Sequence, residues 1–183
     1  MNRIAGSLLF CAASALLLLG GSGRLAAQQD RFRLSAPNGI GFAEIRGYED
    51  WKAVAPSFRT DNDEIRVILA NDTMISAYRS GAPADGRPFP EGSIIVKIGY
   101  SEKKSPSFPA ALVPDVLKRV EFIVKDSRRF PDTAGWGFAR FVFDAGQNSF
   151  APFGKDASFA QQCFTCHTAV KGQDFIFTAY PPR

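Results

Sequence analysis

The sequence predicts an α+β fold, in which a predominantly antiparallel sheet has flanking helices and a C-terminal helix. Three observations indicate this fold. Short runs rich in β-branched and aromatic residues recur between Pro, Gly and Asp, which is typical of antiparallel strands. Helical patterns occur beside these runs rather than throughout the chain. The chain ends in a helical stretch that contains Cys-x-x-Cys-His.

Four runs are predicted to be strands: 64–70, 93–100, 119–126 and 136–144. Alternate residues of a strand share a face, so Lys97 lies with Gly99, whose missing side chain leaves room for something flat. Glu121 shares a face with Ile123 on the next run. Lys97 and Glu121 either point to water on a half-exposed sheet or line a pocket, and the pattern alone leaves both alternatives open.

Three helices are predicted at the edges of the sheet. The first covers 47–54, and a short one around Met74 is capped by Asp72 and ends at Gly81. The third covers 156–170, with Asp156 as its cap. In this last helix Phe159, Cys163 and Cys166 fall on one face.

Residues 1–27 are predicted to be a secretory signal peptide, cleaved after small residues that follow an apolar run. The apolar run from Ile4 to Leu19 is shorter than the roughly 20 residues that a membrane-spanning helix needs, so no membrane association is expected after cleavage. Residues 28–183 then form a single exported domain. Cleavage removes Arg3 and Arg24 but no acidic residue, which leaves only a small positive charge. A nucleic-acid partner is therefore not indicated.

The Cys-x-x-Cys-His stretch fits a covalent haem better than the alternatives. After cleavage the chain keeps only Cys163 and Cys166 as cysteines and His167 as its histidine, whereas a structural zinc site takes four ligands, mostly Cys and His. A redox dithiol usually lies at the N-terminus of a helix in a βαβ unit, and no βαβ pattern precedes this stretch. Two thioethers and an adjacent imidazole are what one c-type haem requires. We expect haem c, bound by Cys163 and Cys166, with His167 as the iron ligand.

The other axial position of the iron is expected to be open. The chain has no second histidine, and Met74, the only methionine besides Met1, more plausibly packs in a helix than binds iron. An open position indicates an iron that binds or transforms a small molecule. A plain electron carrier is less consistent with this ligand set.

Several segments together resemble the cytochrome P-460 family over roughly residues 48–180. They are "ILANDTMISAYRSG", "GSIIVKIGY", "VEFIVKDSRRF", "AGWGFARF" and "PFGKDASFAQQCFTCHTAVKGQDFIFT". The resemblance implies a periplasmic homodimer with one haem, and a lysine that is bonded to the haem as well as the two thioethers. The matching position is Lys97, whose burial would supply the neutral amine that such a bond requires.

The resemblance also implies hydroxylamine oxidation to nitric oxide or nitrous oxide, an activity that serves either energy conservation or detoxification. Glu121 is then the candidate general base, and Arg59 and Arg140 assist electrostatically or bind the haem propionates. A small soluble c-type cytochrome is the expected electron acceptor. The alternative is the sister group, cytochrome c′-beta, which lacks the lysine bond, has a pocket lined by phenylalanines, and binds nitric oxide or carbon monoxide without turnover.

Overall fold

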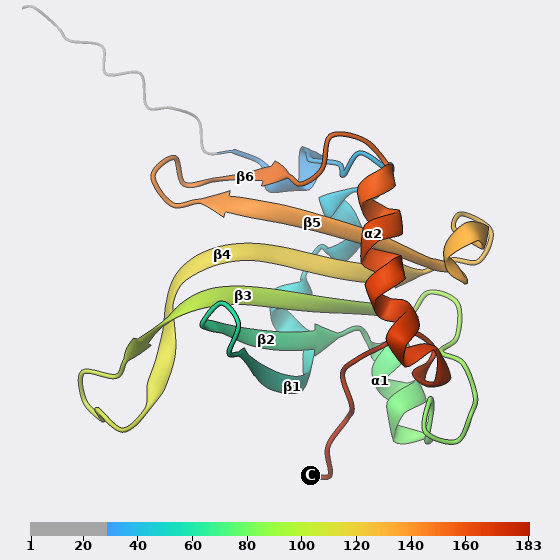
Figure 1. Cartoon of the computed structure of the whole chain (residues 1–183), viewed down its shortest axis with the longest axis horizontal. Coiled ribbons are helices and arrows are strands. Elements are labelled where there is room, and N and C mark those ends of the chain that lie inside the picture. The colour runs from blue at the N-terminus through green and yellow to red at the C-terminus, as the bar shows by residue number, and fades with distance from the viewer. Residues whose placement is uncertain (1–28) are drawn as a thin grey trace, which may run out of the picture.

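The structure, a computed structural model, describes residues 29–183, so the predicted signal peptide at 1–27 lies outside the described residues. An antiparallel sheet dominates it, with helices on its faces and at its edges (Figure 1). The six strands are β1 (Lys52–Arg59), β2 (Glu64–Ala70), β3 (Ile94–Lys104), β4 (Leu112–Lys125), β5 (Trp136–Asp144) and β6 (Ser149–Pro152). Their spatial order follows the chain order, β1-β2-β3-β4-β5-β6. The predicted α+β class is confirmed.

Two α-helices accompany the sheet, α1 (Asp72–Arg79) and α2 (Ser158–His167). Five 3₁₀ segments complete the described elements: Arg31–Arg33, Phe42–Ile45, Tyr48–Asp50, Pro131–Thr133 and Thr168–Gln173. Among residues 29–183, no helix combines the length and the apolarity that a membrane crossing requires.

The predicted helix caps are partly corrected. Asn71, not Asp72, caps α1, because its side chain accepts a hydrogen bond from the Met74 N–H. At α2 the Asp156 carboxylate does accept the Ser158 N–H, at 2.9 Å, although the helix itself begins later than predicted. The helix after His167 tightens into 3₁₀ geometry and ends before an abrupt turn at Asp174.

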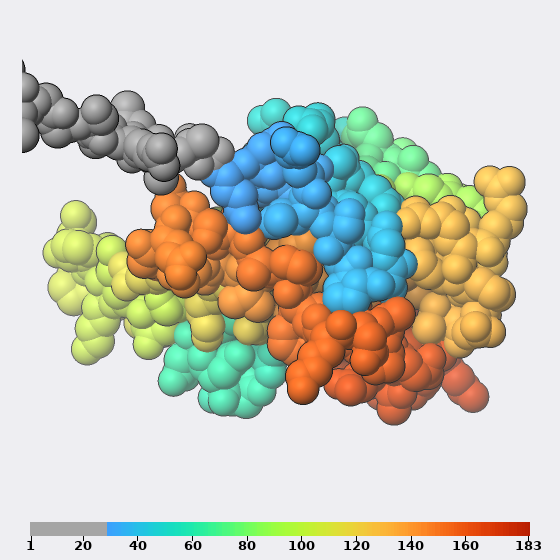
Figure 2. Space-filling view, turned by 90° about the horizontal axis from the view of Figure 1, so that it is seen from above, coloured from blue at the N-terminus to red at the C-terminus, as the bar shows by residue number. Residues whose placement is uncertain are grey.

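The predicted helix at 47–54 is wrong. Only Tyr48–Asp50 make a short 3₁₀ turn, and the chain then enters β1 at Lys52. β1 pairs with β2 along its length, so ladder hydrogen bonds and the burial of Val54 outweigh the helical pattern of a short polar stretch. β3 and β4 also continue past their predicted ends as a projecting hairpin, in yellow-green in Figure 2.

The two faces of the sheet bury separate cores. The N-terminal segment packs on one face, where Phe42 meets Phe122 and Phe141. α1 and the C-terminal segment pack on the other face against Ile95 and Phe138. Figure 2 shows the N-terminal segment in blue on one side and the C-terminal helix in orange and red on the opposite side.

A polar row interrupts the apolar character of the second face. Lys97 on β3 pairs with Glu121 on β4, and Glu121 pairs with Arg140 on β5. Because these positions are directly opposite across the strands, the three side chains leave the sheet on the same side. α2 crosses above this part of the sheet (Figure 1). The fold thereby places a row of charges beneath the helix that carries the two cysteines.

Candidate functional site: a cavity beneath the C-terminal helix

A cavity of about 380 Å³ lies between α2, the sheet and the segment that follows α2. Its walls combine apolar rings with charged side chains. The lining residues are Arg59, Arg66, Ile95, Lys97, Glu121, Phe122, Ile123, Phe138, Ala139, Arg140, Cys163, Cys166, His167, Ile176, Phe177 and Thr178. All five residues predicted from the sequence to form the site therefore meet at one cavity.

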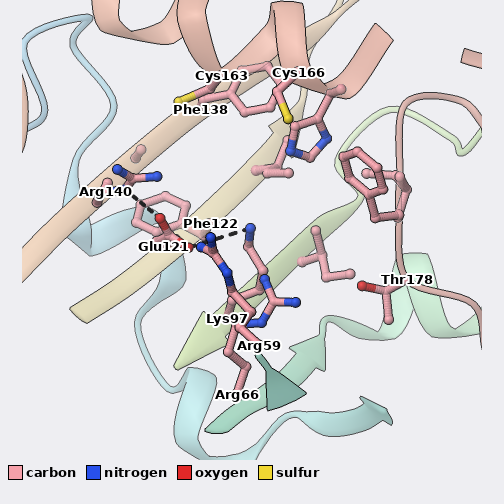
Figure 3. Close-up of a pocket in the computed structure, with 16 residues that line it drawn as sticks. Arg59, Arg66, Lys97, Glu121, Phe122, Phe138, Arg140, Cys163, Cys166 and Thr178 are labelled. Carbon is pink, nitrogen blue, oxygen red and sulfur yellow. Dashed lines mark hydrogen bonds and ion pairs between the residues drawn. The ribbon is translucent and has the colours of Figure 1, made fainter. Parts of the chain in front are cut away.

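Cys163 and Cys166 reach the cavity from α2. Both are free thiols, and Figure 3 shows them pointing from the helix toward the sheet side chains below. Their spacing within a helix brings them to the same side, as the sequence predicts. Burial raises the pKa of the Cys163 thiol. Phe159, expected on the same face of α2, is buried in the core around Phe42, against which Cys163 is also packed.

His167 is oriented by the backbone that follows it. Its Nδ1 lies 2.6 Å from the carbonyl oxygen of Phe175. A carbonyl oxygen only accepts, so Nδ1 carries the proton and donates it, which leaves Nε2 free as a ligand. Burial lowers the pKa of His167 and so favours the neutral imidazole that a metal ion needs. Phe138 and Phe177 hold the ring edge-on, with centroids at 5.0 and 4.9 Å.

Lys97 and Glu121 face these groups from the sheet. Lys97 Nζ lies 3.5 Å from Glu121 Oε2, and their side chains are 20% and 10% exposed. Arg140 also donates a hydrogen bond to Glu121 (Figure 3). Burial lowers the pKa of the Lys97 amine, although the Glu121 charge opposes this effect. The solvent-facing alternative for the two residues is wrong.

Glu121 is held as a carboxylate. Burial alone would raise its pKa, but Lys97, Arg140 and Arg119 outweigh burial and lower the pKa to about 2. Ionised at neutral pH, the carboxylate can accept a hydrogen bond or a proton from a molecule in the cavity. Its basicity increases whenever one of the neighbouring cations loses its charge.

A second buried carboxylate, Glu64, lies beside this row and was not predicted from the sequence. Glu64 at the start of β2 is fully buried, and Arg119 Nη2 lies 2.7 Å from its Oε1. Arg119 Nε is also 3.6 Å from Glu121 Oε1, so Arg119 bridges the two carboxylates. A Cβ at Gly99 would come within 3.0 Å of the Glu64 carboxyl group. The space at Gly99 therefore accommodates Glu64, not the flat group that the sequence suggested.

Two arginines from the edge of the sheet add positive charge to the cavity wall. Arg59 is paired with Asp61, whereas Arg66 donates to the Ser57 hydroxyl at 2.6 Å. Burial and the neighbouring Arg59 lower the pKa of Arg66. Arg66 was not among the residues predicted from the sequence to form the site. Both guanidinium groups suit an anionic group such as a haem propionate.

Met74 is located elsewhere. It is fully buried in the core around α1, outside the cavity. This location agrees with the prediction that Met74 packs in a helix.

The residues fit a haem in chemistry as well as in arrangement. Two thiols for thioether bonds and an imidazole with a free Nε2 line one wall, while apolar rings and cationic groups line the others. These are the groups that attach a porphyrin, ligate its iron from one side and neutralise its carboxylates. The fold and the cavity define the class of c-type haem proteins.

The comparison with protein families gives the same assignment. The sequence model of the cytochrome P460 family matches residues 45–178. The chain belongs to the cytochrome P460 family and is a haem protein of the c type. A comparison with curated proteins found no match.

Proposed function

We propose that this protein is a periplasmic c-type cytochrome that oxidises hydroxylamine to nitric oxide or nitrous oxide. The observation that carries the proposal is the position of Lys97. Its amine projects from β3 into the cavity that Cys163, Cys166 and His167 line from α2. The family resemblance implies a lysine bonded to the haem, which distinguishes hydroxylamine oxidation from simple gas binding, and in this proposal Lys97 forms that bond.

The chain would hold one haem through four residues. Cys163 and Cys166 supply the thioether sulfurs, His167 supplies Nε2 to the iron, and Lys97 supplies a neutral amine to the edge of the macrocycle. The lowered pKa of Lys97 favours this neutral form, because an amine that carries a proton has no lone pair with which to bond carbon. Arg59 and Arg66 provide the cations for propionates.

A haem held by Cys163, Cys166 and His167 would supply an iron that can accept the electrons of hydroxylamine. Oxidation to either product releases protons and electrons in equal number, so the protein must remove both. Glu121 is the proton acceptor in this proposal. Its carboxylate is ionised, borders the cavity, and is more basic when the Lys97 amine is neutral. The electrons pass to a soluble c-type cytochrome.

Steady-state turnover tests the proposal. Purified holoprotein is expected to consume hydroxylamine continuously with an artificial electron acceptor, with release of nitrous oxide or nitric oxide. Tight binding of nitric oxide without any hydroxylamine consumption would contradict the enzymatic function.

Binding of nitric oxide without hydroxylamine consumption is the result expected for the alternative function, a gas-binding protein similar to cytochrome c′-beta. One observation favours it: the rings of Phe138 and Phe177 border the cavity beside His167, and such rings exclude water and bulky ligands. Lys97 and the charged row beneath the rings favour the enzyme instead, since a pocket that only stores a small neutral gas has no need of a proton acceptor.

The remaining parts of the proposal concern the cellular setting. In this proposal the segment at 1–27 directs export to the periplasm, and the holoprotein is a homodimer. The intact mass of the mature protein tests the first, with a chain beginning near residue 28 expected. Light scattering of the holoprotein tests the second.

A further inference from the structure

The segment that orients His167 has an unusual backbone. Asp174 and Phe175, directly after the 3₁₀ turn, have φ values of +47° and +63°. Positive φ is uncommon outside glycine and is an outlier for a bulky residue such as Phe. Such a conformation persists only where surrounding contacts hold it. Here it turns the Phe175 carbonyl back toward the Nδ1 of His167.

The contacts that hold this turn converge on the Asp174 carboxylate. Lys125 Nζ lies 3.0 Å from its Oδ1, and the Trp136 indole N–H donates to the same oxygen at 3.3 Å. The backbone N–H of Phe89 donates to Oδ2 at 2.8 Å. Asp174 is therefore bonded to the ends of β4 and β5 and to the loop before β3, three elements distant in sequence.

Lys125 forms a buried ion pair with this carboxylate. Its side chain is 8% exposed, and Nζ also donates to the Ala134 carbonyl at 3.2 Å and lies 4.7 Å from the centre of the Trp136 ring. A lysine is seldom buried to this degree without a charged partner. The ion pair therefore fixes the turn to the sheet.

We propose that the buried Lys125–Asp174 ion pair is a positioning device for the haem ligand, because it holds the Phe175 carbonyl against the Nδ1–H of His167. The inference rests on haem ligation by His167 but not on hydroxylamine turnover. A fixed acceptor at Nδ1 increases the electron donation of the imidazole to a metal and keeps the ring in one orientation. Asp174 and Lys125 touch neither haem nor substrate in this role.

The test uses the iron–histidine stretching band in the resonance Raman spectrum of the ferrous holoprotein, together with the midpoint potential. Asp174→Ala is expected to shift the band to lower frequency and broaden it, and to raise the midpoint potential, since the imidazole loses its fixed acceptor. Lys125→Met is expected to shift both in the same directions. The matched control is Asp156→Asn, which alters a carboxylate at the other end of α2 and is expected to leave both readouts unchanged.

A variant that is less stable but has the wild-type band and potential would show that the ion pair only stabilises the fold, and would overturn the inference. If Asp174→Ala yields no folded holoprotein, Asp174→Asn takes its place, because the amide keeps an acceptor oxygen for the Phe89 N–H. A smaller shift of the band in the same direction would support the inference. An unshifted band would overturn it. A wild-type protein without any iron–histidine band would instead refute ligation by His167, and the inference with it.

Discussion

Lys97 and Glu121 are direct partners across β3 and β4, with 3.5 Å between the amine nitrogen and the nearer carboxylate oxygen. The pair lies on the sheet face that α2 covers, so its charges face the cavity rather than bulk water. Burial disfavours both charges, and each stabilises the other. Loss of the positive charge of Lys97 would therefore leave Glu121 a more basic carboxylate, which is the property that the proposed function requires of a proton acceptor.

Replacement of Lys97 by Ala should abolish hydroxylamine turnover while haem attachment through Cys163 and Cys166 continues. The thioether bonds form on the opposite wall of the cavity and do not involve the amine. The measurement compares turnover per haem in Lys97→Ala and in Lys103→Ala, which alters an exposed lysine of the β3–β4 hairpin. Equal turnover in the two variants would show that Lys97 has no catalytic function.

Glu121→Gln should lower hydroxylamine turnover by about 10²–10⁴-fold, the range typical for loss of a general base. The amide keeps the size of the carboxylate, so haem content and the visible spectrum should change little. Glu102→Gln, on the outer part of β3, is the control. A variant with the wild-type rate would contradict the assignment of Glu121 as the proton acceptor.

Stability should depend on pH through Glu121. The folded state lowers its pKa from 4.5 to about 2, so its contribution to the free energy of unfolding is complete above about pH 4.5 and is lost as pH falls toward 2. The measurement is the free energy of unfolding of two proteins as a function of pH. The first is the double variant Cys163→Ala/Cys166→Ala, in which Lys97 stays free of the haem. The second carries Glu121→Gln in addition. The difference between their free energies of unfolding should be roughly 3 kcal/mol at neutral pH, the cost of breaking a buried ion pair, and should shrink on acidification. Parallel pH curves for the two proteins would contradict the pKa assigned to Glu121.

Met74→Leu should leave the haem spectrum and nitric oxide binding unchanged. The side chain is fully buried around α1, and a swap of similar volume costs less than about 1.5 kcal/mol of stability. A changed ferrous spectrum, with faster or tighter nitric oxide binding, would instead identify Met74 as an axial ligand that competes with added gas.

Much of this fold could be predicted because its strands have clear patterns. The runs that became the inner parts of β3, β4 and β5 combine β-branched and aromatic residues with clear boundaries. β1 could not be predicted in the same way: Trp51 and Lys52 read as a helix, and Pro56 interrupts the strand pattern. β1 is a strand because it forms antiparallel ladder hydrogen bonds with β2. This is a tertiary effect that local sequence does not encode.

The residues of the site could be predicted from the sequence, but not which charged side chains lie opposite one another across the strands. The Cys-x-x-Cys-His spacing identifies one wall, and a lysine on an apolar face suggests the other. That Lys97 is opposite Glu121, and Glu121 opposite Arg140, depends on strand register, which separate segments do not reveal. Glu64 was missed for a related reason, since only the assembled sheet places it against Gly99 and Arg119.

The mass of the haem peptide shows whether Lys97 is bonded to the haem. After proteolysis of the purified holoprotein, we expect a single haem-bearing species in which the peptide containing Lys97 is joined to the one containing Cys163 and Cys166. A haem peptide that carries the two cysteines but no Lys97 segment would refute the proposed enzyme, and would identify the cavity as a gas-binding site.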